Sequence, residues 1–171
     1  MEAELLLSRA EPVDVASIFA LHQLGLVRLA LMMVGDRATA EDVVQEAFAR
    51  THAGRARLRD PASALAYVRS AVLNQCRSVL RRRAVAFRRP VPHDPPVWSA
   101  EHAALIGEER REVLLALRGL PRRQREALVL RYYFELSDQE IAETMGISGS
   151  TVRSTITRGL AALGKALGEQ S

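Results

Sequence analysis

The chain has 171 residues, enough for one domain of ordinary size or two small ones. Hydrophobic residues make up 48% of the sequence and aromatic residues 5%, which favours helices with real cores and excludes a disordered chain. The 24 Lys and Arg exceed the 20 Asp and Glu by a formal net charge of +4, and Arg greatly outnumbers Lys. The single cysteine, Cys76, excludes an intrachain disulfide framework and predicts a small core residue.

Catalytic and metal sites have no signature in the sequence. The four histidines lack metal-ligand spacing, and no nucleophile–base pair, carboxylate dyad or Walker-type loop appears, so we expect no enzyme, metal or cofactor. No signal peptide is visible, and the apolar stretch Leu24–Val34 is short and interrupted by Arg28. A cytoplasmic protein without a membrane span is expected.

Apolar periodicity predicts a first helix from Val13 to Val34, which Gly35 and Asp36 stop. Thr39, with Asp42 three residues on, is a variant of the capping box and predicts the start of a second helix, which ends near Gly54.

After a loop over residues 55–61, a third helix is expected from about Ala62 to Arg83. The stripe predicted to be buried consists of Leu65, Val68, Val72, Leu73, Cys76, Val79 and Leu80.

Four prolines then fall within seven residues, at positions 90, 92, 95 and 96, which predicts a semi-stiff linker. A helix is expected over Glu101–Gly119, with Leu105, Val113, Leu114 and Leu117 as its apolar set. Pro121 suits the first position of another helix, which runs to Phe134. No segment alternates long enough to predict a strand.

Residues 137–156 read SDQEIAETMGISGSTVRSTI and contain two helix-start signals. Ser137 and Glu140 form a capping box, and Ser148 is placed to cap the next helix. The sequence therefore predicts two short helices joined by a tight connection.

Ala142, Gly146 and Val152 have the spacing that a helix-turn-helix requires. The small alanine permits a close helix crossing, the glycine adopts the positive φ of the turn, and Val152 with Ile156 holds the second helix to its partner. We therefore expect DNA binding, although an ordinary helical hairpin has a similar pattern.

The helix that begins at Ser148 is then the recognition helix in the major groove. Arg153 suits bidentate pairing with guanine. The residues expected to contact bases or phosphates are Ser148, Ser150, Thr151, Ser154 and Arg158. Four arginines of the preceding helix are expected to reach the DNA backbone: Arg122, Arg123, Arg125 and Arg131.

Three segments, in order, resemble the sigma-70 family of RNA polymerase sigma factors. GDRATAEDVVQEAF (35–48) resembles the signature of region 2, and YVRSAVLNQCRSVLRRR (67–83) the helix that melts and recognises the minus-ten element. LPRRQREALVLRYYF (120–134), with the helix-turn-helix after it, resembles region 4. The proline-rich linker stands where larger members have a third domain, which is similar to the extracytoplasmic-function (ECF) group and its actinobacterial sigma-E-like subfamily.

The resemblance implies an all-α fold of two small helical domains. It places region 2 at 13–85, the linker at 86–108 and region 4 at 109–167, and leaves residues 1–12 as a leader that matches nothing in the family. The implied function is a transcription initiation factor that directs core RNA polymerase to promoters. The implied partners are the β′ clamp coiled coil, the β flap, promoter DNA and, in addition, an anti-sigma factor.

The family's residue roles transfer to matching positions. The acidic face formed by Glu41, Asp42, Gln45 and Glu46 would dock on the β′ coiled coil. Asn74 would read a flipped minus-ten base in a pocket closed by residues 58–61. DNA phosphates near the place where the promoter strands separate would be held by Arg77, Arg81, Arg82 and Arg83. Ser78 stands where many members have Asp, and Tyr67 where Trp is frequent.

Three alternatives remain open from the sequence. A stand-alone helix-turn-helix regulator predicts tight binding to a palindromic site without polymerase. An enzyme would need a catalytic constellation, and a sigma-like adaptor would bind proteins without directing transcription.

Overall fold

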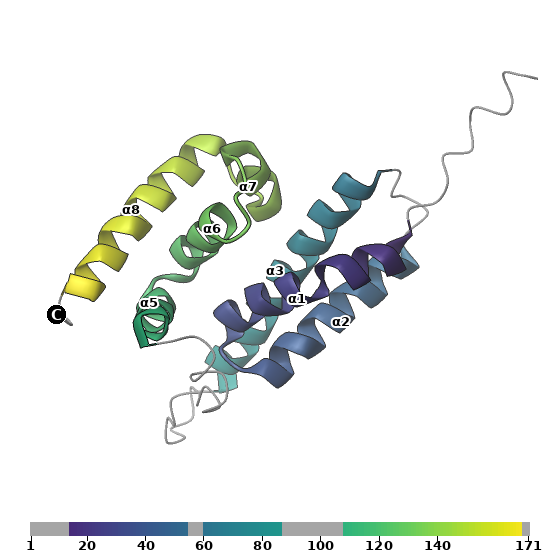
Figure 1. The fold of residues 1–171 in the computed structure, drawn as a ribbon, viewed down its shortest axis with the longest axis horizontal. Helices are drawn as coiled ribbons and strands as arrows, with labels where there is room; N and C mark the ends of the chain where they lie inside the picture. The colour runs from purple at the N-terminus through teal and green to yellow at the C-terminus, as the bar shows by residue number, and fades with distance from the viewer. Residues whose placement is uncertain (1–13, 55–59, 87–107, 169–171) are drawn as a thin grey trace, which may run out of the picture.

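The structure is a computed structural model and describes residues 14–54, 60–86 and 108–168. Within these ranges the chain forms seven helices and no strand, which confirms the expected all-α fold (Figure 1). The predicted leader, the loop at 55–59 and the four prolines of the linker lie outside the described residues.

Helix α1 (Val15–Val34) has a cap at each end. The Asp14 carboxylate accepts a hydrogen bond of 3.0 Å from the Ala16 amide at the start. Gly35 ends the helix with φ +89°, and its amide donates to the Leu31 carbonyl at 2.9 Å. This conformation favours glycine, so the predicted stop at Gly35 is confirmed.

Helix α2 (Arg37–Ala53) begins earlier than the Thr39 cap predicted. The cap is Asp36, whose carboxylate accepts a hydrogen bond of 2.8 Å from the Thr39 amide. The left-handed Gly35 leaves Asp36 extended directly before the helix, in the geometry of an N-cap. The predicted capping role of Thr39 is therefore wrong, while the predicted end at Gly54 is confirmed.

Helix α3 (Pro61–Ala86) is the longest described helix, at 26 residues. Asp60 accepts a 2.8 Å hydrogen bond from the Ser63 amide at its start. Most of the predicted stripe is confirmed as buried, whereas Leu65, Val79 and Leu80 are only half-buried. Burial also raises the pKa of the Cys76 thiol to about 12, in keeping with the predicted core position.

The first three helices pack against one another (Figure 1). By length and composition α1 is the one described helix that could cross a membrane, whereas the shorter stretch Leu24–Val34 was judged too short. Its residues Leu26, Leu29 and Ala30 are fully buried in the protein core, but Leu21 is 79% exposed. Such a pattern also occurs in core helices of proteins that never enter a bilayer.

The second half consists of α5 (Glu108–Gly119), α6 (Arg122–Tyr132), α7 (Asp138–Met145) and α8 (Gly149–Gly168). Pro121 is the residue before α6 rather than its first residue, because its ψ of 137° is extended. Helix α6 stops at Tyr132, two residues before the predicted Phe134. On α5, Ala116 is buried whereas Val113 is 38% exposed, so the apolar set was wrong at that position.

The predicted helix-turn-helix is present in α7 and α8. Both bonds of the Ser137–Glu140 capping box are formed, and Gly146 has φ +66° in the turn. The Ser148 hydroxyl accepts from the Thr151 amide at 3.3 Å at the start of α8. Val152 and Ile156 are buried, as expected for the shared core of the two helices.

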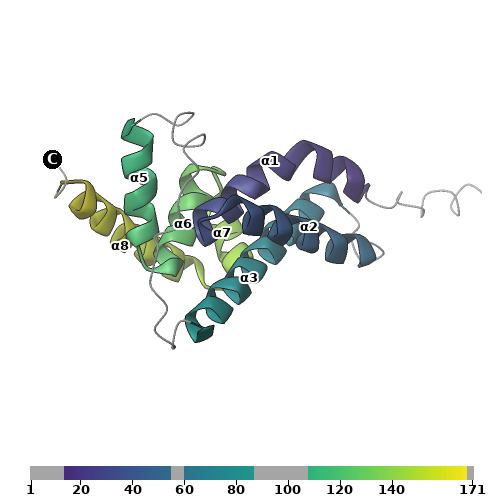
Figure 2. The ribbon, with the colours of Figure 1, turned by 90° about the horizontal axis from the view of Figure 1, so that it is seen from below.

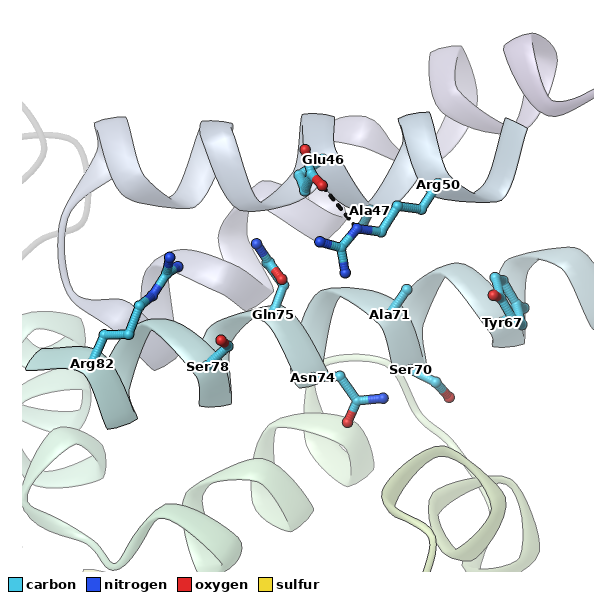
Figure 3. Close-up of a pocket in the computed structure, with 10 residues that line it drawn as sticks. All are labelled: Glu46, Ala47, Arg50, Tyr67, Ser70, Ala71, Asn74, Gln75, Ser78 and Arg82. Atoms are coloured by element: carbon cyan, nitrogen blue, oxygen red, sulfur yellow. Dashed lines mark hydrogen bonds and ion pairs between the residues drawn. The ribbon is translucent and has the colours of Figure 1, made fainter. Parts of the chain in front are cut away.

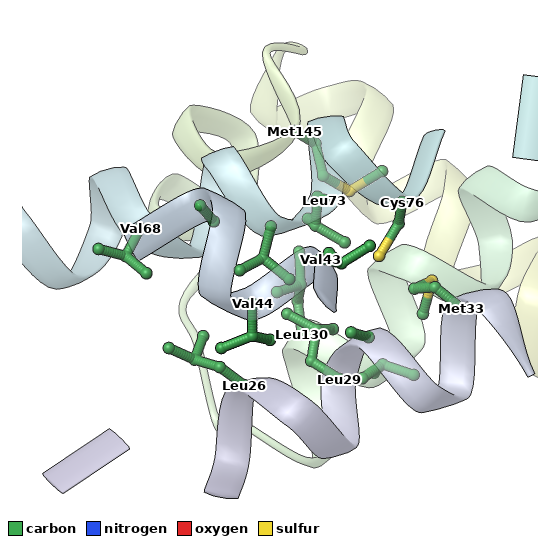
Figure 4. Close-up of a cluster of buried hydrophobic side chains, with 14 of the residues drawn as sticks. Leu26, Leu29, Met33, Val43, Val44, Val68, Leu73, Cys76, Leu130 and Met145 are labelled. Atoms are coloured by element: carbon green, nitrogen blue, oxygen red, sulfur yellow. The ribbon is translucent and has the colours of Figure 1, made fainter. Parts of the chain in front are cut away.

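The two halves of the chain share one cluster of buried hydrophobic residues. Helix α7 packs against α3, and both α5 and α6 pack against α1 (Figure 2). The cluster contains Leu73 of α3 together with Leu130 of α6 and Met145 of α7 (Figure 4). The second half therefore lies against the first in this structure.

Candidate nucleic-acid interface

Helix α8 presents a polar face to solvent. Exposed side chains on it include Ser150, Thr151, Arg153, Ser154 and Arg158. Because Val152, Thr155 and Ile156 are buried on the opposite side, the protein core fixes which face of α8 points outward. The predicted recognition residues therefore lie together on one accessible surface, along with the hydroxyl of the cap Ser148.

Asp138 links the start of α7 to both neighbouring helices. Its carboxylate forms a close ion pair with Arg131 of α6 and a longer one, at 3.4 Å, with Arg153 of α8. The Arg153 side chain is 67% exposed, so this longer pair leaves it accessible to a base or a phosphate.

The arginines of α6 differ in exposure. Arg122 and Arg123 are exposed, as their predicted contact with the DNA backbone requires. Arg125 is only 8% exposed and donates to the Arg118 carbonyl at 2.9 Å, so the same prediction is wrong for Arg125. The contact with the end of α5 explains the error, because it covers Arg125 while Arg122 and Arg123 stay in solvent.

Among the basic residues at the end of α3, Arg81 and Arg82 are exposed whereas Arg83 is tied to the turn between α1 and α2. The Arg83 guanidinium donates to the Val34 carbonyl and to the Asp36 carboxylate at 2.7 Å, and to the Thr39 hydroxyl at 3.0 Å. Burial of Asp36 opposes ionisation, but the bonds from Thr39 and Arg83 outweigh it and lower the Asp36 pKa.

Arg77 forms a bond to each of two carboxylate oxygens. Its Nε donates to Glu126 Oε1 at 2.9 Å and its Nη2 to Glu126 Oε2 at 2.6 Å. The remaining Nη1 donates to the Asn74 side-chain oxygen at 2.9 Å. The hydrogen bond with Glu126 raises the Arg77 pKa above its ordinary value. The structure thus brings Arg77 and Asn74 together and adds Glu126 of α6.

A groove runs between α2 and α3 beside Asn74 (Figure 3). Tyr67, Ser70 and Ser78 of α3 line it, opposite Glu46 and Arg50 of α2. Asn74 itself is exposed at the rim and points away from the Glu46–Arg50 pair (Figure 3). The pocket predicted from residues 58–61 falls largely outside the described residues.

The predicted acidic face of α2 is accessible. Asp42, Gln45 and Glu46 are exposed, and Glu41 is half-buried. Glu41 pairs with Arg37 at 2.6 Å and Glu46 with Arg50 at 2.8 Å, each across one turn of α2. Exposed pairs of this kind contribute little to stability, so they leave the carboxylates available to a basic partner.

Sequence reasoning missed the contacts of Glu126, Asp36 and Arg118. Glu126 is 1% exposed and meets Arg77 across 49 sequence positions. A single sequence gives no signal for such a pair; coupled variation across relatives is the signal that would reveal it. Asp36, by contrast, has a local signal, because an Asp that follows a helix-ending Gly suits an N-cap.

Comparison with protein families gives two matches. The model of sigma-70 region 2 matches residues 18–85, and the model of sigma-70 region 4 matches residues 110–163. The first range covers α2 and nearly all of α1 and α3, and the second covers α7 and most of α8.

Curated relatives include the RNA polymerase sigma-E factor of Streptomyces coelicolor, 32% identical over 83% of this chain and 79% of that protein. The probable RNA polymerase sigma factor RfaY of Xanthomonas campestris pv. campestris is 33% identical over 76% of this chain. The chain spans only 34% of the length of RfaY.

Solved structures with a similar fold include the sigma factor RpoE of Bartonella quintana in complex with the anti-sigma factor NepR. It has a TM-score of 0.75 at 20% identity and covers 90% of this chain and 96% of that chain. CnrH, in complex with the cytosolic domain of CnrY, has a TM-score of 0.69 at 26% identity and covers 92% and 89%. The chain therefore belongs to the sigma-70 family of RNA polymerase sigma factors, in the ECF group, and is a factor for promoter-specific transcription initiation.

Proposed function

We propose that the two matched regions divide the work of promoter recognition. Region 2 (13–85) docks on core RNA polymerase and binds the melted minus-ten element, region 4 (109–167) reads the minus-thirty-five element as duplex, and residues 86–108 link them. The observation that carries this proposal is the exposed polar face of α8, which the helix-turn-helix presents outward.

In region 4, Arg153 reads a guanine in the major groove and Arg158 neutralises a phosphate. The hydroxyls of Ser148, Ser150, Thr151 and Ser154 supply shorter contacts to bases or phosphates. Arg122 and Arg123 on α6 are exposed and reach the flanking backbone. Region 4 alone binds weakly, because one small module buries limited surface.

In region 2, Asn74 reads the Watson–Crick edge of an extruded minus-ten base. Its amide stands exposed beside the groove that Tyr67 lines, where an aromatic ring is available for stacking. Arg81 and Arg82 are exposed on the same helix and hold the phosphates of the strand. Arg77 and Arg83 contribute only when they leave the partners that they have in this structure.

The acidic face of Glu41, Asp42, Gln45 and Glu46 docks on the β′ clamp coiled coil, and region 4 contacts the β flap. Polymerase holds both readers at a fixed spacing and raises their effective concentration on one promoter. The energy that separates the promoter strands then comes from binding. The chain itself catalyses no reaction. The chain works in the cytoplasm, and like RpoE, which is bound to the anti-sigma factor NepR, it is expected to bind an anti-sigma factor.

Run-off transcription with core polymerase and the purified chain on selected genomic fragments tests the proposal. The chain should direct initiation from a subset of fragments, and Asn74→Ala should weaken open-complex formation while polymerase binding is retained. Failure to initiate from any fragment would contradict the function, and equal loss of both activities would contradict the role of Asn74.

Docking is tested by the double variant Glu41→Arg plus Asp42→Arg in a polymerase pull-down. Reversal of two charges on the docking face should abolish binding. The matched control is Glu112→Arg plus Glu143→Arg, which changes the net charge equally at two exposed positions of region 4. Unchanged pull-down of the first variant, or equal loss in the control, would count against this face.

A further inference from the structure

The contact between Arg77 of α3 and Glu126 of α6 joins region 2 to region 4. Two hydrogen bonds, of 2.9 and 2.6 Å, connect the guanidinium to both oxygens of the carboxylate. The Glu126 side chain is 1% exposed and that of Arg77 is 22% exposed. A planar bidentate pair of this kind is strong and fixes geometry as well as charge.

Other contacts hold the same two regions together. The Arg118 guanidinium of α5 lies against Gly35, so close that a Cβ built there would lie 2.1 Å from Nη2. Arg28 of α1 donates to the Tyr133 hydroxyl at 3.4 Å. Helix α7 also packs on α3. The Arg77–Glu126 pair is therefore one of several contacts that join the two regions.

This pair engages the residues that we assign to minus-ten DNA. Two donors of Arg77 are directed at Glu126 and a third at the Asn74 oxygen. A phosphate can bind Arg77 only in competition with the buried Glu126 carboxylate, which already accepts two hydrogen bonds from it. The Asn74 amide is likewise held with its acceptor toward Arg77, so its orientation depends on a residue fixed by region 4.

The pair is also suited to reversible opening. Removal of Arg77 leaves the buried Glu126 with only a longer contact of 3.6 Å to Arg122 of its own helix, which is destabilising. Separation of the two regions differs, because both Arg77 and Glu126 then regain water. The energetic cost of opening is that of the interface as a whole, and a partner that binds the opened chain can supply it.

We propose that Arg77 and Glu126 form an autoinhibitory latch, which keeps region 4 on α3 and withholds Arg77 and Asn74 from single-stranded promoter DNA in the free chain. The latch rests on the proposed minus-ten role of these two residues. Separation of the regions releases both of them together, so the minus-ten reader becomes available only in the opened protein.

The test compares the full-length chain with Glu126→Gln by small-angle X-ray scattering and by binding to a fluorescent dT20 oligonucleotide. Loss of the buried charge should open the chain, with an increase of about 2 Å or more over the radius of gyration of a compact protein of this length, about 15 Å. The affinity for dT20 should rise about three- to tenfold. The matched control is Glu143→Gln, which removes the same charge at an exposed position of region 4.

A second variant separates the latch from the DNA contact. Arg77→Gln removes the link to region 2 and leaves Glu126 with only the longer, 3.6 Å contact to Arg122 on its own helix. The chain should therefore expand as Glu126→Gln does, but the affinity for dT20 should not rise. Both variants should retain the helical circular dichroism of the wild type. If Glu126→Gln fails to fold, Arg77→Gln alone still tests the expansion.

Two results would overturn the proposal. If neither variant expands relative to Glu143→Gln, the pair is not a latch. If both expand but Glu126→Gln binds dT20 no better than the control, closure does not withhold the DNA-binding residues. The second result would leave the interdomain contact standing but end its inhibitory role, and the open-complex assay of Asn74→Ala decides separately whether the minus-ten role holds.

Discussion

Helices α3 and α8 both carry arginines that sequence reasoning assigned to DNA, yet the two helices hold them differently. On α3, Arg77 and Arg83 each bind a carboxylate from elsewhere in the chain, and both are largely withdrawn from solvent. On α8, Arg153 and Arg158 stand exposed on a face that the core orients outward. The proposed minus-thirty-five reader is therefore exposed in this structure, whereas part of the proposed minus-ten reader is engaged in internal contacts.

The difference shows that an arginine-rich run is not one functional unit. In the sequence, Arg81, Arg82 and Arg83 look equivalent. In the structure only the third reaches back to the turn between α1 and α2, because successive helical residues point about 100° apart. A structural arginine and two exposed arginines thus stand side by side in a single run.

The largest effect on stability is expected from Arg83→Ala, which tests the difference between Arg83 and its exposed neighbours. The change removes three hydrogen bonds at the Gly35–Asp36 turn, at a side chain about a third exposed, and should lower the free energy of unfolding by about 2–3 kcal/mol. Urea denaturation measures this. The neighbouring exposed Arg82→Ala should change stability by less than about 0.5 kcal/mol; equal effects would show that Arg83 is not structural.

On α8 the opposite pattern is expected for Arg153→Ala. Its exposed pair with Asp138 contributes little, so stability should change by less than about 0.5 kcal/mol. Binding of the polymerase complex to a responsive promoter should weaken by about 1–2 kcal/mol through loss of a base contact. Competition against scrambled DNA of the same length provides the control. A purely structural Arg153 would lose stability and keep its discrimination.

A pair of glycines on α8 tests how firmly the core orients the recognition face. At Gly159 an added Cβ would lie 3.2 Å from Leu128 Cδ1 and 3.3 Å from Gln124 Cβ on α6. Gly159→Ala should therefore destabilise the chain by about 1 kcal/mol. Gly164→Ala meets nothing within 4 Å and should stabilise the helix by about 0.5–1 kcal/mol. Thermal unfolding measures the change in stability of both variants. A change of the same sign in both would contradict the packing of α8 on α6.

The smallest expected effect is a pH dependence that both halves share. Hydrogen bonds from the Ser137 amide and hydroxyl lower the Glu140 pKa, as bonds from Thr39 and Arg83 lower that of Asp36. Because both folded-state pKa values lie below the unfolded ones, the stabilisation is present at neutral pH and is lost as the pH falls through about 4. Glu140→Gln keeps a capping-box residue but cannot titrate. Its loss of stability between pH 7 and pH 3 in urea unfolding should be smaller than that of the wild type; an identical loss would refute the contribution.

Local sequence signals predicted the helices and the helix-turn-helix. The capping box at Ser137, the glycine stops at Gly35 and Gly146, and the burial of Val152 and Ile156 were all confirmed. These features depend on residues a few positions apart, whose geometry a helix or a turn fixes. The errors at Thr39 and Pro121 were shifts of one to three residues, because several capping candidates stood close together in sequence.

The family assignment also came from the sequence, because two motifs in a fixed order identify sigma regions 2 and 4. Only the tertiary structure decided which arginine side chains are exposed to solvent and which are held by other parts of the protein. The withdrawal of Arg83 to Asp36, the burial of Arg125 and the pairing of Arg77 with Glu126 all join segments far apart in sequence or turn on which helix face meets the core. Charge and periodicity specify that an arginine lies on a helix, but its partner depends on how helices pack, and no local pattern encodes that packing.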